Sequence, residues 1–142
     1  MRILFRLSAV IVLLSALSAC AIRNPVETNS PDIEVAQARY EHSGPTRLTL
    51  YTMVSNRSGQ GAHTSLLINA SERVAFDPAG SFRADGVVAK NDVVYGMTPA
   101  LTDFYTRCHA RETFHVVVQS IDVSPEVAEM ALRKAKTLGP VL

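Results

Sequence analysis

The sequence predicts an α+β protein in which a mostly antiparallel sheet carries a histidine-bearing β-hairpin and packs against two or three helices. Three observations predict this class. Strand-like segments fill the middle of the chain, a three-residue link joins two of them, and two helical patterns follow Thr-Pro and Ser-Pro pairs. With 142 residues, of which 47% are hydrophobic and 19% charged, the chain is sized for one folded domain.

The N-terminus predicts a secretory signal peptide over residues 1–19. Arg2 and Arg6 precede an uncharged apolar stretch at 7–17, which is too short to span the roughly 30 Å hydrocarbon core of a bilayer. The stretch ends in the motif LSAC at 17–20, which resembles the lipobox of bacterial lipoproteins. The alternative is an ordinary secretory signal that happens to contain a cysteine.

The lipobox resemblance implies that Cys20 becomes an acylated N-terminus and anchors the protein to a membrane, at about 0.8 kcal/mol for each buried CH₂. An Asp after this cysteine would resemble an inner-membrane retention signal, and the chain has Ala21. We therefore expect an outer-membrane protein of the cell envelope that faces the periplasm. Residues 20–31 contain two prolines and are expected to form a tether. A lipid on Cys20 leaves Cys108 as the only other cysteine, so no disulfide is expected within the mature chain.

The charge balance gives no reason to expect a nucleic-acid partner. The chain has 14 Lys and Arg against 13 Asp and Glu, and loss of Arg2 and Arg6 with the signal peptide leaves 12 against 13. Two cysteines are also too few for a disulfide framework.

The first half of the domain, which is expected to cover residues 32–142, is rich in strand patterns. A short helix is expected over 32–41, and the link 70–72 predicts an antiparallel hairpin between the strands on either side of it. Residues 78–91 contain two glycines and are expected to form a loop. The expected strands lie at 46–54, 63–69, 73–77 and 92–96.

The second half predicts a helix, a strand and a helix. Thr98-Pro99 and Ser124-Pro125 have the residues of an N-cap followed by the first helical position. Between the two helices, residues 113–123 form the strongest strand pattern of the chain. The apolar faces expected to be buried are Leu101, Phe104, Tyr105 and Cys108 in the first helix and Val127, Ala131, Ala135 and Leu138 in the second.

His63 and Asp77 are the candidate catalytic residues. His63 follows a glycine-containing stretch at 58–62 and opens an apolar strand, so it is expected at a sheet edge on a rigid element, as a general base requires. A three-residue hairpin loop is expected to pair it directly with Asp77, which would fix the tautomer of the imidazole. The structural alternative is that the two residues simply begin and end strands.

A metal site is not expected. Cys108-His109, with His115 further along, suggests metal ligands, but no second cysteine pair or short histidine spacing completes a tetrahedral set. Cys108 is expected to act as a small hydrophobe on its helix face, and His115 as a structural residue of its strand. The sequence predicts no cofactor.

The hairpin also resembles a known family. The runs GAHTSLLI at 61–68 and VAFDPAG at 74–80 are similar to the histidine hairpin of the NlpC-like papain superfamily of cysteine peptidases, amidases and acyltransferases. A strand like 114–118 and then a helix that opens with Ser-Pro-Glu at 124–126 resemble the circularly permuted branch. The resemblance covers roughly residues 46–139 and implies that His63 pairs with a cysteine while Asp77 orients it.

In that branch the nucleophilic cysteine follows the glycine that matches Gly139, and Cys108 does not match its position. The resemblance therefore implies an incomplete, truncated domain that is inactive as given, with an apolar face open around His63, Leu66 and Ile68 or on the Val-rich strand. A complete domain would cleave or transfer an amide or ester in peptidoglycan, a peptide or a lipid. The alternative function is a non-catalytic binding or accessory lipoprotein of the cell envelope.

Overall fold

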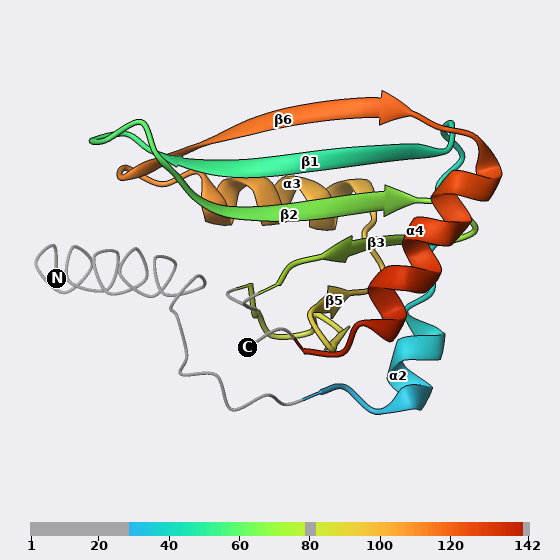
Figure 1. Cartoon of the computed structure of the whole chain (residues 1–142). Helices are drawn as coiled ribbons and strands as arrows, with labels where there is room; N and C mark the ends of the chain where they lie inside the picture. The colour runs from blue at the N-terminus through green and yellow to red at the C-terminus, as the bar shows by residue number, and fades with distance from the viewer. Residues whose placement is uncertain (1–28, 79–81, 141–142) are drawn as a thin grey trace, which may run out of the picture.

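The structure is a computed structural model that describes residues 29–78 and 82–140. These residues form a six-stranded antiparallel sheet with three helices, which confirms the predicted α+β class (Figure 1). The strand order is β4-β5-β3-β2-β1-β6, so the three long strands are neighbours and the two shortest strands lie at one edge. The predicted signal peptide and Cys20 lie outside the described residues.

Most of the observed elements match predicted ones, with shifts at their ends. The strands are β1 (Arg47–Ser55), β2 (Gly61–Asn69), β3 (Arg73–Phe76), β4 (Ala89–Lys90), β5 (Val93–Val94) and β6 (Phe114–Asp122). The helices are α2 (Asp32–Gln37), α3 (Pro99–His109) and α4 (Pro125–Thr137). Thr98 and Ser124 cap α3 and α4 as predicted, because each side-chain oxygen accepts a hydrogen bond from the backbone three residues later.

Strand β4 lies in the segment that was expected to be a loop. It forms a hairpin with β5 through a two-residue turn of Asn91 and Asp92, whose φ angles are 49° and 60°. Asn and Asp tolerate this left-handed conformation, and such turns match the twist of a hairpin. Asn29 and Ser30, which were assigned to the tether, hydrogen-bond to Asn91 and Ala89 beside this hairpin.

The helices cover both faces of the sheet (Figure 1). On one face, Tyr105 and Cys108 of α3 pack against Tyr51, Met53 and Leu67. On the opposite face, Leu132 and Ala135 of α4 pack against Ile68 and Val74. Neighbouring residues of β2 and β3 thus alternate between two small cores.

The buried face of α4 differs from the predicted one. Ala128, Leu132 and Ala135 are buried, whereas Val127 and Leu138 are exposed. Leu132 packs against Ile68 and Val74 in this core. Of the predicted set, Ala135 is buried and Ala131 is partly buried against the same core. The tertiary contact, and not the apolar spacing alone, sets the orientation of the helix.

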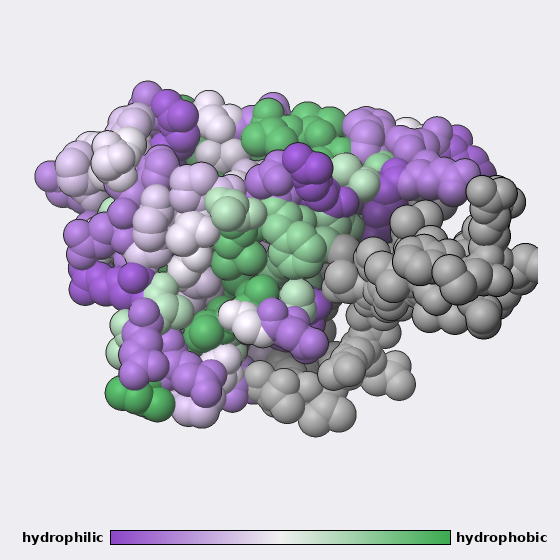
Figure 2. All heavy atoms as spheres, turned by 180° about the vertical axis from the view of Figure 1, so that it is seen from behind, coloured by the Kyte–Doolittle hydropathy of each residue, from purple (hydrophilic) through white to green (hydrophobic). Residues whose placement is uncertain are grey.

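Strand β6 is an edge strand with exposed apolar side chains. Val118 and Ile121 are 50% and 63% exposed, and hydrophobic surface lies along the upper edge in Figure 2. The expected open face around His63, Leu66 and Ile68 is not formed as one surface, since His63 and Leu66 lie on opposite faces and Ile68 is buried under α4. Within the described part of the chain, no helix is long and apolar enough to cross a membrane.

Candidate functional site

His63 lies near the start of β2, at the end of the sheet where the β1–β2 ladder becomes irregular. It pairs with Met53 across the ladder, and the register shifts between Met53 and Val54 directly beside it. The histidine side chain is 20% exposed. A ring that is held by a strand and still reaches solvent meets the steric needs of a general base.

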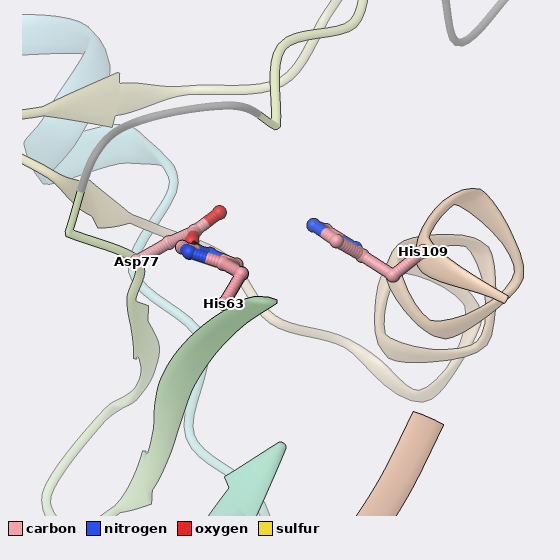
Figure 3. A group of neighbouring side chains, drawn as sticks. All are labelled: His63, Asp77 and His109. Carbon is pink, nitrogen blue, oxygen red and sulfur yellow. Dashed lines mark hydrogen bonds and ion pairs between the residues drawn. The ribbon is translucent and has the colours of Figure 1, made fainter. Parts of the chain in front are cut away.

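Asp77 follows β3 and is fully buried, with a side-chain exposure of 0%. Its backbone N–H donates to the carbonyl of Asp92 at 2.7 Å, which fixes this residue where β3 ends. Its Oδ1 accepts a hydrogen bond from Nε2 of His63, so the predicted His63–Asp77 pair is present (Figure 3). Oδ2 has no hydrogen-bond partner among the described residues.

The predicted register of the pair is wrong in one respect. The hairpin has the expected three-residue loop, because Asn69 pairs with Arg73. Leu66 then pairs with Phe76, which places Asp77 level with Ser65 and diagonal to His63. The two side chains still meet because residues two apart on a strand share one face of the sheet.

His109 is the third residue of the site and was missed as a partner of His63. It is the last residue of α3, and its ring stacks on that of His63 with centroids 6.0 Å apart and planes at 14° (Figure 3). Its Nδ1 donates to the carbonyl of Tyr105 at 2.8 Å, which leaves Nε2 as an acceptor. The available signal was helical spacing, since Leu101, Tyr105 and His109 recur every four residues.

The surroundings move the pKa values of the two histidines in opposite directions. The hydrogen bond to Asp77, helped by its negative charge, raises the pKa of His63 above 6.5 despite partial burial. Burial lowers the pKa of His109 below 6.5. His63 therefore keeps its ring proton to a higher pH than His109 does.

An aromatic wall closes one side of the site. Tyr105 is 1% exposed and donates from its hydroxyl to Oγ of Ser65 at 2.5 Å. Phe82 packs edge-on against Tyr105 and tilts over His109, with centroids at 4.8 and 5.9 Å. These rings keep water away from the inner side of the dyad and fix the position of His109.

The described residues place no nucleophile beside His63. Asp77 is the only residue in this part of the chain with a hydrogen bond to the His63 side chain. Ser65 is buried, and its hydroxyl accepts a hydrogen bond from the hydroxyl of Tyr105. His115 lies apart from the site on β6, where its Nδ1 donates to Oδ1 of Asn56.

Cys108 is buried in the α3 core, as its helical position predicted. It is bonded in a disulfide, which differs from the expectation that the mature chain has none. With or without the disulfide, Cys108 is 6% exposed within this core, and a buried structural cysteine is unreactive, so it does not supply the missing partner of His63.

Three ligand atoms in the site have a spacing that suits a metal ion. One atom each from His63, Asp77 and His109 lie within 4.8 Å of one another. Two imidazoles and a carboxylate are ligands that zinc accepts in catalytic sites. The structure thus brings together a possible ligand set that the sequence analysis, which grouped His109 with Cys108 and His115, did not contain.

Comparisons with known proteins identify no relative. No model of a known protein family, no curated protein and no solved structure matches this chain. The similarity of the hairpin to the NlpC-like papain superfamily therefore stays a hypothesis.

Proposed function

We propose that this protein is a lipid-anchored protein of the cell envelope whose domain carries the general-base pair of a thiol hydrolase or acyltransferase of the permuted papain-like class. The observation that carries the proposal is the hydrogen bond between the fully buried carboxylate of Asp77 and the partly exposed ring of His63. A buried carboxylate that fixes a histidine at the rim of a site is the arrangement that general-base catalysis needs.

In this proposal each ring nitrogen of His63 has its own role. Nε2 of His63 is occupied by Asp77, so Nδ1 is the atom that exchanges a proton with a nucleophile. A thiol would transfer its proton to Nδ1, and the thiolate would attack the carbonyl carbon of an amide or ester. The imidazolium would then return the proton to the departing amine or alcohol and leave a thioester, which water or a second acceptor cleaves.

The substrate class is an amide or ester of peptidoglycan, a peptide or a lipid. Since no nucleophile lies beside His63 in the described residues, we propose that the chain by itself has no hydrolase activity. The proposed base is then detectable only when a thiol is supplied. A non-catalytic accessory lipoprotein is the competing function and predicts no thiol-dependent reaction.

A thiol supplied in solution should reveal the base. We expect the protein to accelerate cleavage of p-nitrophenyl acetate by added N-acetylcysteamine, measured as p-nitrophenolate release, because His63 can take the thiol proton. His63→Ala should abolish this acceleration, whereas His115→Ala, which removes an exposed histidine outside the site, should retain it. Equal rates for the three proteins would favour the accessory function.

A divalent metal at His63, Asp77 and His109 is the second candidate, favoured by the closeness of their ligand atoms and by the unpartnered Oδ2 of Asp77. A metal bound to His63 would either displace the hydrogen bond between Nε2 and Asp77 or occupy Nδ1, and each outcome disables the proposed base. The same assay with added Zn²⁺ or a chelator distinguishes the two functions. The general base predicts inhibition by zinc and no effect of the chelator, whereas a metal centre predicts loss of activity with the chelator.

The lipid anchor is tested at Cys20. Labelled palmitate should be incorporated into the protein in bacterial cells, and Cys20→Ser should remove the label and leave an uncleaved or soluble precursor. The chain has two cysteines, so a lipid on the Cys20 sulfur and an intramolecular disulfide to Cys108 exclude one another. Labelled protein should therefore show one reactive thiol, at Cys108, after unfolding. Label that persists in Cys20→Ser would contradict the lipoprotein proposal.

A further inference from the structure

A cavity lies on the α3 face of the sheet, at the opposite end of β2 from His63. Its volume is about 210 Å³. Its walls come from β1, β2, β3, β6 and the segment before β1, and they include His42, Arg47, Thr49, Asn69, Arg73 and Ser120. From the α3 side, this end of the molecule has a mostly hydrophilic surface (Figure 2).

The cavity is lined by basic groups and contains no carboxylate among its lining residues. Arg47 is neutralised by Asp122, with 2.6 Å between Nε and Oδ1. Arg73 has no such partner, and its buried Nε makes no hydrogen bond within the described part of the chain. Burial also lowers the pKa of the Arg73 guanidinium, which shows the cost of its desolvation.

Arg73 is held in this position by its backbone. Its N–H donates to the carbonyl of Tyr40 at 2.8 Å, and its own carbonyl accepts from the N–H of Met97 at 3.2 Å. A partly buried guanidinium without a counter-charge is unfavourable unless an anion binds to it. The planar fork of arginine suits a carboxylate, which can accept two parallel hydrogen bonds.

Asn69 adds a second unpartnered atom, which is a hydrogen-bond acceptor, whereas Nε of Arg73 is a donor. It is 6% exposed, and its Oδ1 has no hydrogen-bond partner in the described residues. The amide orientation is settled by its neighbours, because Nδ2 donates to the carbonyl of Pro45 at 2.6 Å. This acceptor and the unpartnered Nε of Arg73 border the same cavity, and both atoms are covered, so a ligand reaches them when the side chains that cover them move.

The third polar element is a pair of hydroxyls. Oγ1 of Thr49 and Oγ of Ser120 lie 2.9 Å apart and share one hydrogen bond. Only one of the two protons is used in that bond, so the other hydroxyl can donate to a ligand. The cavity thus offers several donors for an anion and one acceptor for an N–H group.

From this arrangement we infer that the cavity binds a small carboxylate with an adjacent N–H, of the kind found in an N-acylated amino acid or the C-terminal residue of a peptide. The carboxylate of the ligand pairs with Arg73, and the adjacent N–H of the ligand donates to Oδ1 of Asn69. The inference is independent of the proposed base at His63, since the two sites share no residue.

Titration calorimetry of the full chain in mild detergent tests this site with N-acetylalanine as the probe. We expect saturable binding at millimolar concentration or below. N-acetylalanine amide, which lacks the carboxylate, and propionate, which lacks the N–H, should each bind at least about tenfold more weakly, the loss of one charged or buried hydrogen-bonded contact. Binding of inorganic phosphate in preference to N-acetylalanine would overturn the assigned ligand class.

Matched variants locate the binding. Arg73→Met should weaken N-acetylalanine binding at least about tenfold, and Arg73→Lys should give an intermediate affinity because it keeps the charge and loses the fork. Arg57→Met removes an arginine from an exposed turn outside the cavity and should bind as the unchanged protein does. Circular dichroism establishes that each variant is folded. Absence of saturable binding, or equal binding by folded Arg73→Met, would overturn the inference.

Discussion

Tyr105→Ala is expected to lower the free energy of unfolding by about 3–5 kcal/mol, the range for truncation of a buried aromatic side chain. Tyr105 joins α3 to the sheet, packs edge-on against Tyr51 with centroids 5.7 Å apart, and supports the ring of His109. Its removal leaves a cavity between helix and sheet and leaves Ser65 without its hydrogen-bond donor. Urea denaturation followed by circular dichroism measures the change.

Tyr105→Phe is the matched control for this prediction. It keeps the ring and removes only the hydroxyl that donates to Ser65, so a smaller loss of about 1–3 kcal/mol is expected. Both variants should be compared with the disulfide of Cys108 in the same state. Tyr105→Ala with a stability within 1 kcal/mol of the unchanged protein would show that α3 does not depend on this contact.

Asp77→Asn is expected to lower the thiol-dependent cleavage of p-nitrophenyl acetate by a factor on the order of 10² to 10⁴, or to the uncatalysed rate if that is reached first. An amide can still hydrogen-bond to His63, but it carries no charge to stabilise the imidazolium and can select the wrong tautomer. Asp85→Asn makes the same chemical change at an exposed position outside the site. A rate for Asp77→Asn equal to that of Asp85→Asn would remove Asp77 from the mechanism.

Local patterns predicted most of the secondary structure because each pattern has a local cause. Alternating apolar residues and Pro-containing caps identified β1, β2, β6, α3 and α4. Strand β5 lies within the strand expected at 92–96, whereas β4 and its pairing with β5 were missed because a two-residue strand has almost no periodicity. Its signal was the Asn-Asp turn at 91–92, which is weaker than an Asn-Gly pair.

The candidate site was predicted in part for a similar reason. His63 and Asp77 are close in sequence and lie on adjacent strands of one hairpin, so their meeting follows from the three-residue loop and the shared face. His109 comes from a helix 46 residues after His63, and its approach depends on how α3 packs on the sheet. The position of Arg73 beside a cavity that has no carboxylate in its lining depends likewise on contacts among four strands.

The pKa of His63 also determines how the dyad affects stability. A folded-state pKa above 6.5 means that protonated His63 stabilises the fold. This contribution is fully present below the pKa of the unfolded chain and is lost as the pH rises through the higher, folded-state pKa. The dyad therefore stabilises the fold most below about pH 6.5, the ordinary histidine value.

The most direct test of the His63–Asp77 dyad is a titration of the His63 ring by NMR in the presence of a chelator, with the resonance assigned by its loss in His63→Ala. The predicted result is a His63 pKa above 6.5 that falls in Asp77→Asn, while His109 titrates below 6.5 in the unchanged protein. A His63 pKa at or below 6.5, or one that Asp77→Asn leaves unchanged, would contradict the proposed general-base pair.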